Sequence, residues 1–259
     1  MLTAFGILGL LQISLLPALI IRKAGKLRGG LAEQLIWLMP LSMTANYLLV
    51  FLLIVLHLYK RPVMLGVIGA ECLCLLWLYR KTLLQPLQES FRQISSGIQR
   101  ELQPVQDFLS EKQSLGGWIW FLSGCLAFSG VLWGFHLCRL NFGTVFSGWD
   151  TLFSWNAYAE TWAAGNIPHI EGLYPQLVAS NWSISYLLQG EGAVQFFNTL
   201  LPPVFFLLIQ MMLFDQGFQR RESGFFFAAV IARFMMKKLM GDQLFDGYMD
   251  VPVAAMSLV

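Results

Sequence analysis

An aspartate, an asparagine and two tryptophans stand together in the segment 148–156, between two apolar runs of the chain. They are Trp149, Asp150, Trp155 and Asn156. A carboxylate beside a substrate hydroxyl can act as a general base, and tryptophan is enriched at membrane–water interfaces. The segment therefore predicts an active site at the edge of a membrane. The plainer alternative is that Asp150 only caps a helix and that the tryptophans only belong to the interfacial belt.

A group of cations and a second aspartate stand later in the chain. Arg233, Lys237 and Lys238 precede Asp250. A transfer reaction that releases an anionic group benefits from positive charge near the leaving group, so these three side chains are predicted to supply it. The alternative is that the two lysines anchor the chain at lipid headgroups by snorkelling.

Aspartates recur every four residues in the same region, at Asp242, Asp246 and Asp250. Such spacing places them on one face of a helix, and a solvated face is the simplest interpretation. Oxygen ligands also suit Mg²⁺ or Mn²⁺, so a divalent cation is the alternative. We predict no cofactor.

The composition indicates a membrane protein. Of the 259 residues, 56% are hydrophobic and only 12% are charged, whereas soluble domains carry about 25% charged residues. The net charge of +2 gives no reason to expect a nucleic-acid partner. The cysteines fall in or beside apolar runs, so we interpret them as small apolar side chains rather than as disulfides or metal ligands.

Apolar runs predict an all-α polytopic bundle of transmembrane helices, because about 20 apolar residues cross a bilayer. The first run has no charged start and no cleavage site, so it is predicted to be a retained helix rather than a signal peptide. Residues 1–81 form the N-terminal helices, 82–114 an amphipathic cytoplasmic segment, and 115–259 a core with a long outer loop at 140–195. The predicted spans are 2–21, 35–58, 63–78, 115–137, 196–214 and a marginal 225–236, and a further apolar run begins at 251.

The positions of lysine and arginine orient these helices, because cytoplasmic loops are rich in both. No lysine or arginine lies between Arg139 and Arg220, so 140–195 is predicted to be extracytoplasmic. It is predicted to contain two interfacial helices, 151–164 and 176–188. Within the membrane, Glu71 is a functional candidate by default, and we expect it to pair with a hydroxyl or a histidine.

Three motifs of this chain resemble a known family. They are Gly148-Trp149-Asp150-Thr151-Leu152-Phe153-Ser154-Trp155-Asn156, Tyr174-Pro175-Gln176-Leu177 and Gly247-Tyr248-Met249-Asp250-Val251-Pro252. In this order they resemble bacterial membrane glycosyltransferases of the GT-C fold, related to the protein O-mannosyltransferases and the lipid A aminoarabinose transferase. The resemblance covers roughly residues 115–259.

This resemblance implies transfer of a sugar from a polyprenyl-phosphate donor to an acceptor hydroxyl, with inversion, on the periplasmic side of a bacterial inner membrane. By the same resemblance, Asp150 is the general base and Asp250 the second acid. The residues expected to line the substrate site are Trp149, Trp155, Asn156, His169, Tyr174, Arg233, Lys237, Lys238 and Tyr248. The expected partners are membrane lipid and the lipid-linked sugar, and the sequence does not identify the acceptor.

The chain also departs from the family pattern. Tyr158 stands where relatives often carry a lysine or arginine, and several helices precede the Trp-Asp motif where many relatives have one. Relatives usually continue for several further helices, so we expect a truncated chain, with or without transferase activity. The alternatives are a non-catalytic membrane subunit that binds lipid-linked sugar, and a transporter of such lipids, although the broken, pseudo-symmetric halves of a transporter are not evident.

Overall fold

Helices make up all the regular secondary structure that the computed structural model describes. The described residues are 4–25, 31–83, 115–141, 148–149, 151–169, 176–190, 209–214, 216–217, 221–235 and 253. No strand occurs among them. The all-α fold class is confirmed for this part of the chain.

The N-terminal apolar run forms two helices rather than the single helix that we expected. α1 (Ala4–Ser14) and α2 (Leu16–Ala24) are separated at Leu15. Pro17 explains the break, because proline has no backbone N–H and its ring crowds the carbonyl of the residue four positions earlier. Together the two helices still form one stretch long and apolar enough to cross a membrane, Ala4–Ala24.

Two long helices follow. α3 (Leu31–Val55) contains Pro40, and α4 (Arg61–Leu83) begins after a short turn. In that turn His57 has a positive φ of 57°, a left-handed conformation that residues other than glycine rarely adopt. The turn is therefore a local point of backbone strain.

The second half of the chain supplies one long helix and several short ones. α6 (Leu115–Asn141) is the longest helix described. A π-helical turn, η1 (Thr151–Trp155), leads into α7 (Asn156–Ala163), and α8 (Leu177–Gln189) follows. α11 (Arg221–Val230) continues into a second π-helical turn, η2 (Ile231–Met235). Helices thus occur where they were expected, at 151–164 and 176–188, and Gly165, with a φ of 82°, follows the first. Their predicted place at a membrane interface stays a prediction.

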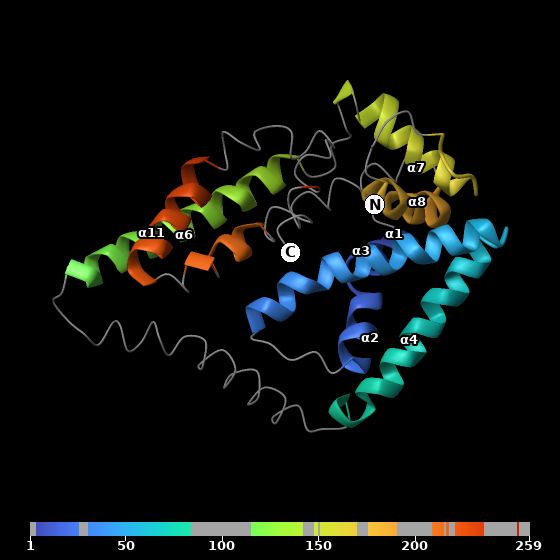
Figure 1. The fold of residues 1–259 in the computed structure, drawn as a ribbon, viewed down its shortest axis with the longest axis horizontal. Coiled ribbons are helices and arrows are strands. Elements are labelled where there is room, and N and C mark those ends of the chain that lie inside the picture. The colour runs from blue at the N-terminus through green and yellow to red at the C-terminus, as the bar shows by residue number, and fades with distance from the viewer. Residues whose placement is uncertain are drawn as a thin grey trace.

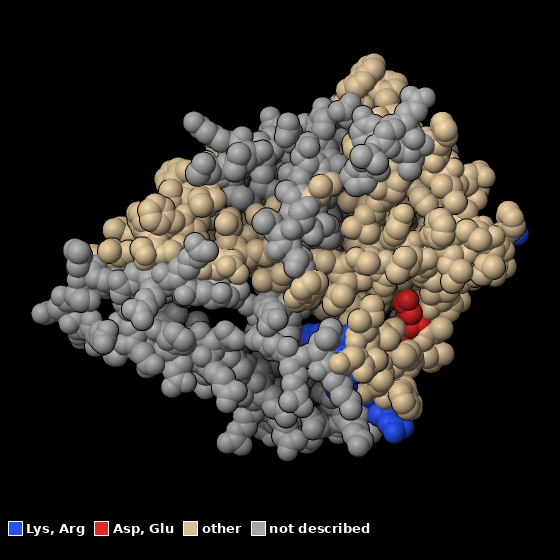
Figure 2. All heavy atoms as spheres, in the orientation of Figure 1, with Lys and Arg blue, Asp and Glu red and all other residues tan. Residues whose placement is uncertain are grey.

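Within the described residues, four helical stretches are long and apolar enough to cross a membrane: Ala4–Ala24, Ile36–Val55, Arg61–Arg80 and Trp118–Leu137. Large apolar side chains such as Trp77 on α4 and Phe135 on α6 are exposed. The surface drawn in Figure 2 accordingly shows few charged atoms among the described residues. Both observations are expected of helices that face lipid.

Of the later predicted spans, 225–236 is short in the structure and 196–214 is described only at its end. Ser223–Phe234 is apolar but falls in the shorter class of 10–17 residues, which agrees with the marginal status of 225–236. Only the last residues of 196–214 are described. Residues 84–114, which hold nearly all of the predicted amphipathic segment, lie outside the described residues.

The described helices form two groups in space (Figure 1). The first, called here the N-terminal assembly, consists of α1, α2, α3, α4, α7 and α8, which pack on one another. The second, called here the C-terminal pair, consists of α6 and α11 with η2. Side chains of α6, including Trp133 and Leu137, and the segment 209–213 reach the same hydrophobic core as the N-terminal assembly.

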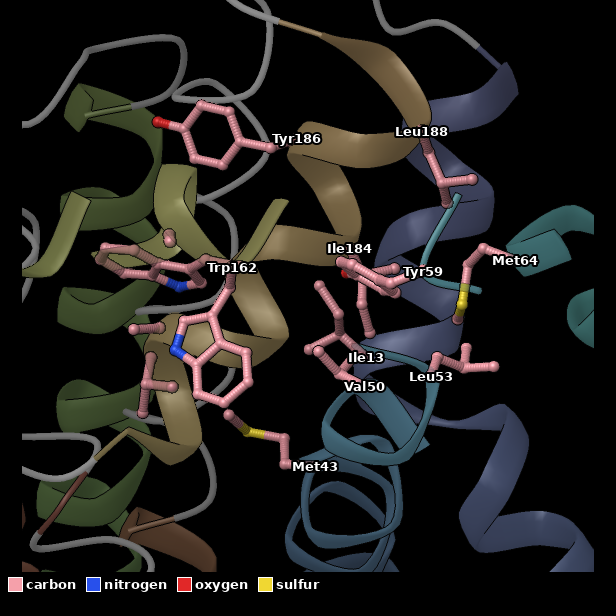
Figure 3. Close-up of a cluster of buried hydrophobic side chains, with 14 of the residues drawn as sticks. Ile13, Met43, Val50, Leu53, Tyr59, Met64, Trp162, Ile184, Tyr186 and Leu188 are labelled. Atoms are coloured by element: carbon pink, nitrogen blue, oxygen red, sulfur yellow. The ribbon is translucent and has the colours of Figure 1, made fainter. Parts of the chain in front are cut away.

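Helix α8 lies at the centre of the N-terminal assembly and is buried on nearly every side. Ile184 and Leu188 contribute apolar side chains to the core in Figure 3. Ser180, Asn181, Ser183 and Ser185 of the same helix are also buried. A helix with buried polar residues on several faces needs partners for them, and neighbouring helices provide several.

Candidate functional site

The residues on either side of Asp150 differ sharply in exposure. Trp149 is 69% exposed and packs against Phe153, with the two ring centroids 4.1 Å apart. Trp155 and Asn156, at the far end of η1, are each only 7% exposed. The same motif therefore holds two exposed rings, Trp149 and Phe153, and two buried side chains, Trp155 and Asn156.

Buried hydrogen bonds hold the inner end of this motif. The Tyr186 hydroxyl of α8 donates to Oδ1 of Asn156, and Nδ2 of Asn156 donates to Glu160 Oε1 at 2.8 Å. Further along α7, Nε1 of Trp162 donates to Oε1 of Gln176 at 2.9 Å. These contacts fix α7 against α8. Asn156 and Trp155 therefore position the segment from within.

The π-helical turn η1 spans most of the first motif. One-turn π-helical segments are rare, and many occur at functional sites. The other π-helical turn, η2, contains Arg233, the cation predicted to serve the leaving group. Both features fall on residues singled out by their chemistry.

The structure does not bring these two π-helical turns together. η2 packs on α6 and α11, and Figure 1 shows this group across the molecule from α7. The guanidinium of Arg233 lies over the Phe234 ring, 5.3 Å from its centroid. His169 is exposed in the segment after Gly165, so it does not share the buried contacts of Asn156.

Several predicted site residues lie outside the described residues. They are Asp150, Tyr174, Lys237, Lys238, Tyr248 and Asp250, together with Asp242 and Asp246. Among the described residues, no group of three or more metal-ligating histidine, cysteine or acidic side chains occurs. Cys72, Cys74 and Cys125 are free thiols.

A buried polar cluster inside the N-terminal assembly was missed by sequence reasoning. The Ser42 hydroxyl and the Asn46 amide of α3 donate to the backbone carbonyl of Gln12 at 2.9 and 2.8 Å. The Gln12 side chain in turn donates to Asn46 Oδ1 at 2.9 Å and to Glu71 Oε1 at 3.2 Å. The partner of Glu71 is thus an amide, and our expectation of a hydroxyl or a histidine is wrong.

The signal for this cluster was present in the sequence. Gln12 and Asn46 are amides inside otherwise apolar runs, and polar residues in such runs often face the bundle interior. The structure adds a reason that the sequence did not reveal, because the backbone carbonyl of Gln12 lies four residues before Leu16, where α2 begins after the helix break. A carbonyl beside a break needs donors from elsewhere, and α3 supplies them.

A second polar contact joins α8 to the turn between α3 and α4. The hydroxyls of Tyr59 and Ser183 are 2.7 Å apart, and Figure 3 shows Tyr59 beside Ile184 in the buried cluster. Burial raises the pKa of the Tyr59 phenol above its ordinary value, although the Ser183 hydrogen bond opposes this shift. Asn181 Nδ2 also donates to the Met43 carbonyl at 3.0 Å.

Comparisons with protein-family models, with curated proteins and with solved structures find no match to this chain.

Proposed function

We propose that the chain is an integral membrane glycosyltransferase of the GT-C type, which moves a sugar from a polyprenyl phosphate to an acceptor hydroxyl. The proposed site faces the periplasm of a bacterial inner membrane. Support comes from three motifs in family order and from the described part of the chain, which is helical and contains four stretches suited to crossing a membrane. The orientation rests on the distribution of lysine and arginine.

The observation that carries the proposal is the two-ended environment of the first motif. Trp149 is exposed on one side of Asp150, while Trp155 and Asn156 are buried and tied to α8 on the other side. Reactive groups need rigid support from the residues behind them. The hydrogen bonds of Asn156 and Trp162 give the buried part of the segment such support, while Trp149 stays exposed.

The proposed reaction gives each acid a separate task. The Asp150 carboxylate takes the proton of the acceptor hydroxyl while that oxygen forms the new bond to the anomeric carbon of the sugar. The bond from that carbon to the phosphate oxygen breaks, and the lipid phosphate leaves as an anion. Asp250 orients the reactants, and Lys237 and Lys238 offset the charge on the phosphate.

Substitution of Asp150 by Asn tests the proposal. In membranes supplied with a polyprenyl-phosphate sugar, Asp150→Asn should lower transfer by about 10²–10⁴-fold, the usual contribution of a general base. The matched control is Glu171→Gln, which removes another carboxylate of the same loop and should leave transfer unchanged. Thermal unfolding of both variants in detergent should match that of the parent chain.

Two outcomes would contradict the proposal in different ways. Full transfer by Asp150→Asn would remove the general-base assignment. A parent chain that binds the lipid-linked sugar but transfers none, with the affinity kept in Asp150→Asn, would identify a non-catalytic binding subunit instead.

A further inference from the structure

Glu71 is an acidic residue inside a helix suited to crossing the membrane. It lies on α4 within Arg61–Arg80, and its described partner Gln12 lies on α1 within Ala4–Ala24. Nε2 of Gln12 donates to Oε1 of Glu71 at 3.2 Å. This hydrogen bond is a direct polar link between α1 and α4.

Two oxygen atoms of this pair are buried without a hydrogen-bond partner among the described residues. They are Oε2 of Glu71 and Oε1 of Gln12. If Glu71 is ionised, both oxygens can only accept hydrogen bonds. Leaving two buried acceptors unsatisfied, one of them on a charged group, is costly in an apolar environment.

Rotation of the Gln12 amide does not remove the problem. Asn46 Nδ2 must face the backbone carbonyl of Gln12, to which it donates. The other end of the Asn46 amide, Oδ1, therefore accepts from the side-chain Nε2 of Gln12. Exchanging the oxygen and nitrogen of Gln12 would set its oxygen against Asn46 Oδ1. The network therefore fixes the amide with its nitrogen toward Glu71 Oε1.

No described cation neutralises Glu71. Helices α1 and α8 contain no charged residue, and the only charged residue in α3 is Glu33, near its start. The cations of α2 are Arg22 and Lys23, and the Lys23 ammonium lies over the Tyr79 ring, 4.9 Å from its centroid.

The other titratable groups on the helices packed around Glu71 are few. Helices α3 and α8 carry Tyr47 and Tyr186. Helix α4 itself carries Cys72, Cys74, Tyr79, Arg61, Arg80 and Lys81.

We propose that Glu71 is a neutral carboxylic acid in the folded protein and that it forms a two-bond pair with the Gln12 amide. Gln12 Nε2–H donates to Glu71 Oε1, and Glu71 Oε2–H donates to Gln12 Oε1. One proton then satisfies both unpartnered oxygens. The pair clamps α4 to α1, and loss of that proton releases the clamp.

Infrared spectroscopy of the full chain in lipid vesicles at neutral pH tests whether Glu71 carries a proton. The parent chain should show the carbonyl band of a protonated carboxylic acid, and Glu71→Gln should lack it. Gln12→Leu should move the band to higher frequency, because the carbonyl loses its hydrogen bond. The matched control is Glu160→Gln, which should leave the band unchanged because Glu160 is exposed on α7, outside the candidate spans.

Thermal unfolding tests the pairing independently of transferase activity. Glu71→Gln should keep the midpoint of the parent chain, because two amides form the same pair of hydrogen bonds. Glu71→Ala should lower the midpoint, because both bonds are lost. Comparable loss in Glu71→Gln and Glu71→Ala would overturn the proposal, as would the absence of the band at neutral pH.

A bound monovalent cation is the competing explanation, because it would also satisfy two acceptor oxygens. Sodium chloride should leave the midpoint of the parent chain unchanged relative to choline chloride. A rise with sodium in the parent chain that disappears in Glu71→Gln would overturn the neutral acid and identify a cation site.

Discussion

The N-terminal assembly and the C-terminal pair hold their helices together by different means. In the N-terminal assembly, buried side chains such as Gln12, Asn46 and Asn181 bond across helices. In the C-terminal pair, glycine and alanine bring the backbones close, as where Gly130 of α6 faces Ala232 of η2. Packing of small residues and interhelical hydrogen bonds are the two main sources of helix association in lipid. One chain therefore uses both sources in separate places.

Aromatic rings also pack between the two helices of the C-terminal pair. The rings of Trp120 on α6 and Phe225 on α11 stack with centroids 4.9 Å apart. Gln210 is buried near Gly130, and neither its amide oxygen nor its nitrogen has a hydrogen-bond partner among the described residues. Polar bonding thus contributes little where the small residues meet, and the two regions should respond to different substitutions.

The largest expected effect comes from a tryptophan in the N-terminal assembly. Trp162 is 1% exposed, donates to Gln176 and meets the Tyr47 ring edge-on. Trp162→Ala should lower the free energy of unfolding by about 3–5 kcal/mol, measured by denaturant titration in mixed micelles. Trp118→Ala, at a site 68% exposed on α6, should change it by less than about 0.5 kcal/mol. Equal losses would remove the distinction between interior and lipid-facing tryptophans.

A smaller effect is expected where glycine allows the close approach of α11. A Cβ atom placed on Gly217 would lie 2.8 Å from the Ala228 Cβ, so the two segments must move apart. Gly217→Ala should cost about 1–3 kcal/mol, as overpacking usually does. Gly66→Ala is the matched control, since a Cβ atom there meets nothing within 4 Å. An unaffected Gly217→Ala would contradict the packing of α11 described here.

The smallest effect concerns the phenol of Tyr59 in the turn before α4. Tyr59→Phe removes the contact with Ser183 and should cost about 0.5–1.5 kcal/mol. Because burial raises the Tyr59 pKa in the folded chain, the folded phenol keeps its proton where an unfolded tyrosine loses it, at about pH 10. Stability is therefore fully present below that pH and falls as pH rises beyond it.

Unfolding measured from neutral to alkaline pH checks this expectation. The decline above about pH 10 should be shallower in Tyr59→Phe than in the parent chain. Ser183→Ala should keep the steeper decline, because it removes the hydrogen bond but leaves the phenol in place. Identical declines in the parent chain and Tyr59→Phe would show that this phenol does not contribute.

The sequence predicted the helices well because their signals are local. Long apolar runs indicated α3, α4 and α6, and the Asp150–Gly165 pattern indicated the helix that became η1 and α7. The break at Leu15 was not predicted, although Pro17 is its cause. One proline inside an apolar run is compatible with a continuous, kinked helix in lipid, so the run alone did not reveal the separation.

The contacts of the site were harder to predict because they join distant parts of the chain. The position of Glu71 inside an apolar run indicated a functional candidate, but its partner Gln12 lies 59 residues away. Asn156 was predicted to line a substrate site, and no periodicity revealed that Tyr186 would occupy its Oδ1. The roles of Asp150 and Asp250 stay predictions, because both lie outside the described residues.

The burial of α8 has a consequence for the order in which the protein is assembled. At 13 residues this helix is too short to cross a bilayer alone. Its polar groups would be exposed to hydrocarbon if it entered the membrane before its partner helices. Its partners at Gly9, Met43 and Tyr59 all leave the ribosome earlier. We therefore expect α1, α3 and the turn before α4 to be in place before α8 packs against them.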